Sequence, residues 1–257
     1  MRIRYIPANP SGNLTAFVLT AVEAKARAAV AAQMMARCPE GFEQVGFIDE
    51  ASLDTPLPRL DMMGGEFCGN ATRAFALLAA GRRGLGETAL SISISGAKAP
   101  VHVELDMQRG NAYADMPLPG ALVTRMLGNL EIPIICMEGI EHAVVCGLPP
   151  TPQMAQAVLE VMPPEEAQGV LFVQGARMTP MVYVRATDTR VWESSCGSGT
   201  VALGWYLARM AADGEHGYTF EEPGGQLSVR VRMQGGRAVR AVMGGKVTLG
   251  EMREIEL

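Results

Sequence analysis

The sequence holds few of the patterns by which proteins bind cofactors. Its three lysines lie in no context that is typical of a pyridoxal Schiff base. His102, His142 and His216 show no metal-ligand spacing among themselves or with the cysteines. Neither a dinucleotide-binding GxGxxG motif nor a phosphate-binding loop is present. We therefore expect the protein to work without a cofactor and without a metal ion.

Long apolar runs and clustered charges are also missing. No stretch of eighteen apolar residues occurs, which predicts that nothing spans a membrane. The 22 basic and 27 acidic residues give a net charge of −5, spread along the chain rather than gathered into a basic face for nucleic acid. The five cysteines include no CxxC pair and no disulfide-like spacing. We expect free thiols in a reducing cytoplasm, with neither a nucleic-acid nor a membrane partner.

One internal repeat is present. The segment CGNAT at 68–72 recurs as CGSGT at 196–200, so that the two cysteines lie 128 positions apart, about half the chain. A run with helical periodicity precedes each cysteine by about 45 residues, at 22–37 and at 151–162. Gene duplication is the simplest explanation of this pattern.

The segments after each cysteine predict the fold class. Residues 71–80 and 200–212 are apolar nearly all round, so each must form a helix that other structure encloses. The strands that follow come in hairpin-like groups, which favours an α+β fold over a doubly wound one. We expect two pseudo-symmetric halves, residues 1–118 and 119–257, each a mostly antiparallel sheet wrapped around a central apolar helix, with the active site in the cleft between. The strand-like segments are 88–95, 101–108 and 111–116 in the first half and 217–222, 226–233 and 237–243 in the second.

Both repeated cysteines are therefore expected where a buried helix begins. A helix N-terminus presents unpaired N–H groups and about half a positive charge, so it binds an anion such as a carboxylate. A thiol there gains thiolate character, and we expect its pKa to fall below ~8.5. Two such helix ends would offer a sulfur to each face of one α-carbon. This arrangement predicts a two-base racemase, in which one thiolate removes the α-proton and the opposite thiol returns a proton.

The other three cysteines have a different interpretation, and two alternative functions for the repeated pair fit the sequence less well. Cys38, Cys136 and Cys146 lie outside the repeat and are interpreted as small buried hydrophobic residues, since Cys136 and Cys146 fall in apolar strand-like runs and Cys38 follows a helix. A thiol–disulfide redox protein is a hypothesis from another class, but it leaves the missing CxxC pair and the glycine motifs unexplained. A non-catalytic module that binds an amino acid would need no thiol at both helix ends.

The cysteine segments carry a family resemblance. GGEFCGNATRA and SSCGSGTVAL resemble the two cysteine motifs of the diaminopimelate epimerase superfamily. The similarity extends over nearly the whole chain, through Gly12-Asn13, Glu43-Gln44, the GIEH segment at 139–142 and the EEPGGQLSV segment that begins at Glu221. It implies two similar halves, each a sheet wrapped on a central helix, with the site between them.

The resemblance also assigns roles to individual residues. Cys68 and Cys196 would be the acid/base pair, and Asn13 and Gln44 would contact the substrate. Backbone N–H groups at four positions would hold the substrate carboxylate: Gly69, Asn70, Gly197 and Ser198.

Two further residues match the family with their roles open. His142 matches a histidine near the catalytic thiols, and a strand histidine hydrogen-bonded within the sheet explains it equally well. Glu193, three residues before Cys196, matches a glutamate that supports a thiol, and a solvated turn residue is the alternative.

The sequence departs from the family at the positions that recognise the far end of diaminopimelate. Ile140 and Gly169 stand where the family has asparagines, and a third asparagine position falls near Asp61-Met62. The Glu-Arg-Gly segment upstream of the second cysteine has no clear counterpart. The residues that act on the α-carbon are thus retained while the distal ones are lost, so we expect no efficient diaminopimelate epimerase activity.

These departures guide the substrate prediction. The chain is similar to histidine racemases of opine-metallophore pathways, and histidine is our first substrate prediction. Asp61, Glu66 and Glu141 would favour a neutral or cationic side chain, unless they simply face solvent. Proline or hydroxyproline racemases and diaminopimelate epimerase are alternatives, as are phenazine-biosynthesis isomerases, which lack the paired cysteines. We expect a free amino acid as the partner, and a homodimer is one assembly compatible with the sequence.

Overall fold

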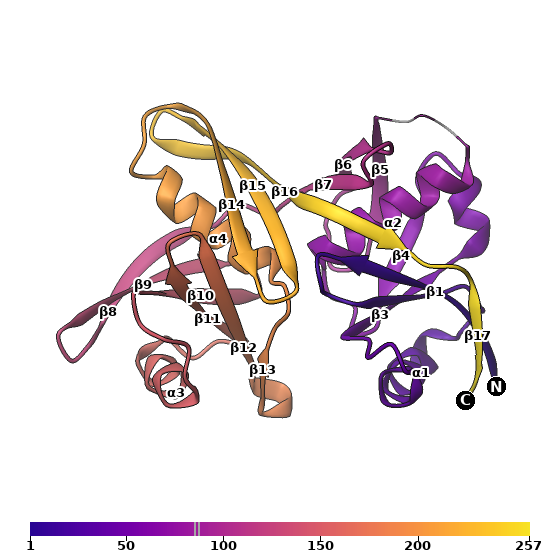
Figure 1. Cartoon of the computed structure of the whole chain (residues 1–257), viewed down its shortest axis with the longest axis horizontal. Coiled ribbons are helices and arrows are strands. Elements are labelled where there is room, and N and C mark those ends of the chain that lie inside the picture. The colour runs from indigo at the N-terminus through magenta and orange to yellow at the C-terminus, as the bar shows by residue number, and fades with distance from the viewer. Residues whose placement is uncertain (85, 87) are drawn as a thin grey trace. The chain divides into compact units, whose positions relative to one another are not determined.

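The computed structural model describes residues 1–84, 86 and 88–257 and divides the chain into two compact units (Figure 1). The first unit contains Met1–Asp115 and Gly244–Leu257, and the second contains Met116–Met243. Most of the regular structure is strand, with four α-helices in the described part, so the mixed α+β class is confirmed. Within those same residues, no helix is both long and apolar enough to cross a membrane.

The C-terminal segment differs from the predicted division. The predicted boundary after residue 118 lies close to Asp115, but Gly244–Leu257 belongs to the first unit rather than the second. The reason is strand pairing, since β16 (Arg237–Leu249) and β17 (Arg253–Glu256) both pair antiparallel with β1 (Arg2–Pro10).

In the first unit the strands form a continuous circuit. The pairs β1–β2, β3–β4, β5–β6 and β6–β7 are antiparallel, and the pairs β2–β3 and β4–β5 are parallel. The strand β7 then pairs with β16, and β16 pairs with β1. Buried side chains of these strands pack on α2 (Gly69–Arg82) in one core. The other strands are β2 (Thr15–Val18), β3 (Gln44–Ile48), β4 (Arg59–Met62), β5 (Ala89–Ile94), β6 (Val101–Asp106) and β7 (Asn111–Asp115).

In the second unit the helix α4 (Gly197–Ala208) contacts β9, β10, β14 and β15. The pairs β10–β11 and β12–β14 are parallel, and the pairs β8–β9, β9–β10, β11–β12, β12–β13 and β14–β15 are antiparallel. The strands are β8 (Ala121–Leu127), β9 (Leu130–Met137), β10 (Ile140–Cys146), β11 (Ala167–Gln174), β12 (Arg177–Val184), β13 (Thr189–Trp192), β14 (Gly214–Glu222) and β15 (Gly225–Gln234).

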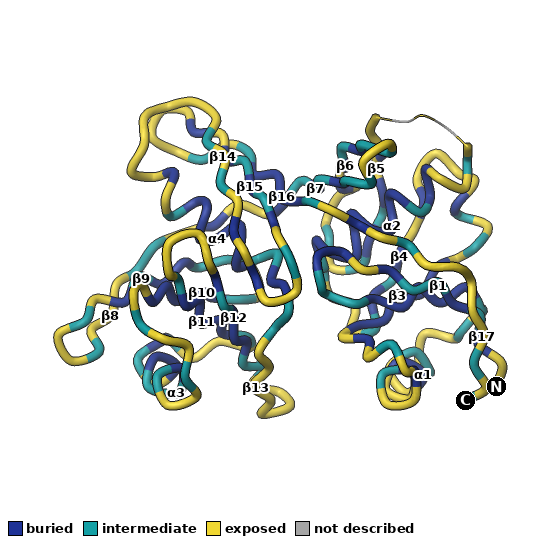
Figure 2. The backbone as a smooth tube through the Cα atoms, in the orientation of Figure 1, coloured by how far each residue is buried: buried dark blue, intermediate teal, exposed yellow. Residues whose placement is uncertain are grey.

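The helices differ in how far they are buried. Eleven of the 14 residues of α2 and eight of the 12 residues of α4 are buried, which Figure 2 shows as dark blue tube. By contrast, α1 (Ala24–Arg37) and α3 (Pro152–Val161) bury three residues each. The predicted enclosure is therefore confirmed for 71–80 and for 200–208, whereas residues 209–212, predicted as part of the second helix, follow α4 and are exposed. Two short 3₁₀ helices complete the elements, at Glu50–Asp54 and Arg185–Thr187.

The first prediction concerns the core around α2. Phe75 has no exposed surface, and its ring centroid lies 6.0 Å from that of Phe17. Phe75→Ala should lower the free energy of unfolding by about 3–5 kcal/mol, because it leaves a cavity in a closed core. Denaturant unfolding measures this, with Met252→Ala, whose side chain is 55% exposed, as the control. A loss no larger than the control's would show that α2 is not enclosed.

Candidate functional site

The first thiol site, which we define as Cys68, Gly69, Asn70, Asn13 and Gln44, is built on the start of α2. Cys68 is the N-cap residue of this helix, as predicted, and its sulfur accepts a hydrogen bond of 3.4 Å from the N–H of Ala71. The sulfur thus takes the place that a serine or aspartate oxygen usually fills. Gly69 and Asn70 follow as the first two helical residues, and both are buried.

The two amide side chains predicted to contact a substrate lie together in this unit. Gln44 donates to the Asn13 side-chain oxygen at 2.6 Å and to the Thr15 hydroxyl at 2.8 Å. The Asn13 amide in turn donates to Glu43 at 2.6 Å. The Gln44 side chain also hydrogen-bonds the Cys68 sulfur, which lowers the pKa of that thiol. The structure therefore brings Asn13 and Gln44 to the first thiol.

Arg73 joins the same site, although the sequence analysis assigned it no role. Its side chain is fully buried and donates to the Asn70 side chain at 3.2 Å and to the Ser11 hydroxyl at 3.0 Å. The same guanidinium donates to the carbonyls of Gly245 and Lys246, both at 3.1 Å. It thus ties the start of α2 to the turn before Asn13 and to β16. A lone charge on an otherwise apolar helix was the signal that could have found it.

The second thiol site, which we define as Cys196, Gly197, Ser198, His142 and Glu193, is built on the start of α4. Cys196 is the N-cap residue, again as predicted, but in the described part of the chain its sulfur accepts no hydrogen bond from a helix N–H. It lies 3.6 Å from the Ser198 hydroxyl oxygen. That hydroxyl lies 2.9 Å from Nε2 of His142, so the histidine is linked to the thiol through Ser198.

The protonation of His142 follows from its surroundings. The ring is fully buried, burial lowers its pKa to about 3, and Nδ1 has no hydrogen-bond partner in the described part of the chain. An unpaired buried lone pair costs less than an unpaired N–H, which places the single proton on Nε2. Nε2–H then donates to Ser198, whose own proton is left to point at the Cys196 sulfur.

Gly169, which stands at an expected asparagine position, is explained by the same ring. It is paired with His142 in the parallel register of β10 and β11. A Cβ on Gly169 would lie 2.1 Å from Nδ1, so any larger residue would displace the imidazole. The loss of the asparagine therefore makes room for His142 in this position.

Two carboxylates lie by the second thiol. Glu193, predicted from the family, hydrogen-bonds the Cys196 thiol and raises its pKa. Glu222, which the sequence analysis did not single out, is buried, and its two oxygens accept from the Cys196 N–H at 2.6 Å and from the Thr200 hydroxyl at 2.5 Å. Its place directly before the Pro223-Gly224-Gly225 turn was the available signal.

Both thiols are harder to ionise than expected from helix position alone. Burial raises the pKa of Cys68, and the N–H of Ala71 and the Gln44 amide offset part of that rise. Burial raises the pKa of Cys196 well above its ordinary value, and the charges of Glu193 and Glu222 raise it further. The expected fall in pKa is therefore wrong for the protein without substrate, because desolvation outweighs the hydrogen bonds that favour the thiolates.

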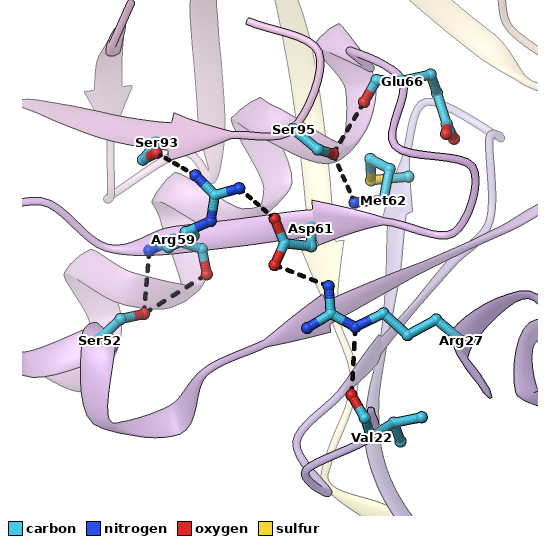
Figure 3. Close-up of polar contacts among 9 residues, drawn as sticks. All are labelled: Val22, Arg27, Ser52, Arg59, Asp61, Met62, Glu66, Ser93 and Ser95. Atoms are coloured by element: carbon cyan, nitrogen blue, oxygen red, sulfur yellow. Dashed lines mark hydrogen bonds and ion pairs between the residues drawn. The ribbon is translucent and has the colours of Figure 1, made fainter. Parts of the chain in front are cut away.

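The acidic residues proposed to face a substrate side chain have separate surroundings. Figure 3 shows Asp61 between Arg27 and Arg59, with ion-pair distances of 2.8 Å and 2.6 Å. Its charge is thus already compensated. Glu66 accepts from the N–H of Gly64 at 2.9 Å, and its charge acts on the Cys68 thiol.

Glu141 and the three other cysteines lie outside the two thiol sites. Glu141 is buried beside Cys136, whose pKa rises to about 11 through burial and this carboxylate. Cys38 is buried, as predicted, and Cys136 is partly buried. Cys146 is exposed, so its interpretation as a buried residue is wrong, because it ends β10 directly before the Gly147 turn.

Comparison with known proteins gives sequence relatives over most of the chain. A family model described as the histidine racemase CntK N-terminal domain matches residues 2–252. A histidine racemase of Staphylococcus aureus is 28% identical over 243 residues, 88% of each chain. A histidine racemase of Fusobacterium nucleatum is 30% identical over 220 residues, 80% of each chain.

Solved structures share the fold at low sequence identity. A phenazine biosynthesis protein of the PhzF family from Enterococcus faecalis has a TM-score of 0.67 at 16% identity and covers all of both chains. A probable proline racemase from Agrobacterium radiobacter has a TM-score of 0.65 at 13% identity, with 99% of this chain and 93% of the other covered.

The second prediction concerns the pH dependence of stability. Because the folded pKa of His142 lies near 3 and the ordinary value is 6.5, the unfolded chain takes up this proton first as the pH falls. Stability from the neutral ring is complete above pH 6.5 and declines toward pH 3 by about 1.4 kcal/mol per unit. Unfolding of wild type and His142→Asn at several pH values measures the difference, with the exposed His102→Asn as the control. Parallel pH profiles for wild type and His142→Asn would contradict the prediction.

Proposed function

Because the chain belongs to the family of the histidine racemase CntK N-terminal domain and is an amino-acid racemase, we propose that it inverts the α-carbon of histidine with two thiols. In this proposal Cys68 and Cys196 are the two bases, and no cofactor takes part. The observation that carries it is the repeated helix start: each of two buried helices has a cysteine as its N-cap residue.

The proposed mechanism places the first and second thiol sites on opposite faces of one substrate. The two units would then be pseudo-symmetric halves with the site between them, and the repeat of parallel pairs, β2–β3 and β4–β5 in one unit and β10–β11 and β12–β14 in the other, supports this. Backbone N–H groups at both helix starts would hold the substrate carboxylate. Their partial charges would also stabilise the negative charge that develops as the α-proton leaves.

The chemical step transfers one proton on each face. The thiolate of one cysteine accepts the α-proton, and the thiol of the other donates its own proton to the opposite face of the same carbon. The first cysteine ends as a thiol and the second as a thiolate, so charge and protons balance. Asn13 and Gln44 would contact the substrate from the first unit, and Ser198, oriented by His142, would donate to the Cys196 thiolate when it forms.

The choice of histidine rests on the relatives and on the distal positions. The curated relatives are histidine racemases. Ile140 and Gly169 offer no side-chain amide, and Asp61 is held by two arginines, so a second ammonium and carboxylate would lack partners. A buried charge without partners costs several kcal/mol. Glu66 leaves a negative charge near the first thiol, which suits a neutral or cationic imidazole.

The third prediction tests the two thiols. Cys68→Ala and Cys196→Ala should each lower kcat for racemisation of histidine by at least about a thousandfold, because general acid–base catalysis is removed on one face. Cys146→Ala, at an exposed cysteine, is the matched control and should keep its activity. Chiral chromatography measures turnover, and circular dichroism checks the fold. Substantial activity in either thiol variant would refute the two-thiol mechanism.

A solvent experiment separates two bases from one. In D₂O, the product enantiomer should carry deuterium from its first appearance, while the remaining substrate keeps its α-hydrogen at early times. The reason is that the accepting thiol and the donating thiol are different groups. Mass spectrometry of the separated enantiomers measures this. Deuterium that enters substrate and product together would indicate a single base that exchanges its proton.

The fourth prediction concerns substrate choice. Histidine should be turned over with a kcat/KM at least about a hundredfold above that of LL-diaminopimelate, or about 2.7 kcal/mol of transition-state discrimination. A panel of L-amino acids that includes proline gives the comparison under one set of conditions. Efficient turnover of diaminopimelate would overturn the argument from the distal positions, and turnover of proline alone would overturn histidine.

A further inference from the structure

The two thiol sites differ at matched positions of the repeat. Position 73 in α2 is a buried arginine, and the matched position 201 in α4 is a buried valine. The matched threonines also differ in their partners. Thr72 donates to the carbonyl of Cys68 at 2.7 Å, whereas Thr200 donates to the Glu222 carboxylate at 2.5 Å. The sites therefore share a backbone plan but not the charges around it.

Around the first sulfur, donors predominate. The N–H of Ala71 points at Cys68 with a distance of 3.4 Å, and the Gln44 amide hydrogen-bonds it as well. Asn70 beside it is held by the buried Arg73 cation. Glu66, whose residue is exposed, is the acidic group that acts on this thiol. Direct donors favour the charged form of a thiol.

Around the second sulfur, carboxylates predominate. Glu222 is buried and accepts a hydrogen bond from the backbone N–H of Cys196, and Glu193 hydrogen-bonds the thiol. Ser198 is the hydroxyl donor within reach, and His142 behind it is neutral. No helix N–H bonds this sulfur in the described structure, in contrast to Cys68. Two nearby negative charges favour the protonated form of a thiol.

We infer that the hydrogen-bond donors at Cys68 and the buried Glu222 carboxylate at Cys196 make the thiol sites unequal, so that Cys68 ionises first and Cys196 keeps its proton in the substrate-free protein. Glu222 acts as a positioning residue through the start of α4, where it accepts the N–H of Cys196. The inference rests on the proposed function, in which these thiols are the acid/base pair. The substrate-free protein then binds productively the enantiomer whose α-hydrogen faces Cys68. After one turnover Cys196 is the thiolate and Cys68 carries a proton, so Cys68 must release a proton to solvent and Cys196 must take one up before the substrate-free form is restored.

The fifth prediction measures ionisation of each thiol without substrate. Purified protein is treated briefly with iodoacetamide at a series of pH values, and mass spectrometry of peptides gives the alkylation of Cys68 and Cys196 separately. The midpoint for Cys68 should lie at least about one pH unit below that for Cys196, a tenfold difference in ionisation. Because two interacting thiols titrate as a pair, the same series is run on Cys196→Ala and Cys68→Ala.

Substitution of the buried carboxylate tests the cause. Glu222→Gln keeps an oxygen acceptor and removes the charge, so the midpoint of Cys196 should fall by about one pH unit while that of Cys68 stays unchanged. Glu221→Gln is the matched control, since Glu221 is the exposed neighbour on the same strand. Glu193→Gln should lower the alkylation midpoint of Cys196 as well. It replaces Glu222→Gln as the test if circular dichroism shows that Glu222→Gln does not fold.

The outcomes separate this inference from the proposed function. Three results would overturn the inference, even if both thiols are essential for racemisation. They are equal alkylation midpoints for the two cysteines, a lower midpoint for Cys196, and an unchanged Cys196 midpoint in both Glu222→Gln and Glu193→Gln. Conversely, a lower alkylation midpoint for Cys68 than for Cys196, together with a fall of the Cys196 midpoint in Glu222→Gln, would support the inference even if the substrate is not histidine. Activity of the thiol variants is the readout for the proposed function, and alkylation does not depend on it.

Discussion

The structure depends on which groups accept hydrogen bonds from the unpaired N–H groups at the N-terminus of a buried helix. A helix leaves its first N–H groups without partners inside itself, and inside a protein each unpaired N–H costs free energy. Both α2 and α4 are largely buried, so these groups need acceptors at hand. In α2 the Cys68 sulfur is one such acceptor, and in α4 the Glu222 carboxylate takes the N–H of the N-cap residue. A place that must accept hydrogen bonds is also one where an anion binds well.

The surrounding residues meet that need with different chemistry in each unit. Arg73 fixes Asn70 from one side of α2, and a neutral imidazole fixes Ser198 at α4. The buried arginine has five N–H donors that need acceptors, and it joins β16 and the Ser11 turn to the start of α2. Glycine at 169 is required because the imidazole occupies the space of a side chain there. Much of the sequence around each cysteine is thus set by a few polar groups that cannot be left unpaired.

Local patterns were sufficient for most elements, and for both cysteines as helix starts, because apolar periodicity and capping act over a few residues. The roles of Arg73 and Glu222 could not be predicted, because their partners Lys246 and Cys196 lie far away in the sequence and no local pattern reveals such a hydrogen bond. The pKa of the thiols was misjudged for a related reason, since the dipole is local but burial comes from the whole fold. Cys146 was misplaced because a strand pattern does not show where the strand leaves the core.

The path of the chain also sets an order of folding during synthesis. The second unit, Met116–Met243, is one continuous stretch, whereas the first needs Gly244–Leu257 to complete its circuit of strands at β1 and β7. The N-terminal segment is synthesised first, yet it lacks its closing strands until Gly244–Leu257 has left the ribosome. The second unit can therefore fold before the first is complete, while β1 has no partner strand on one of its edges. Such an edge invites pairing with other chains until β16 and β17 pair with β1.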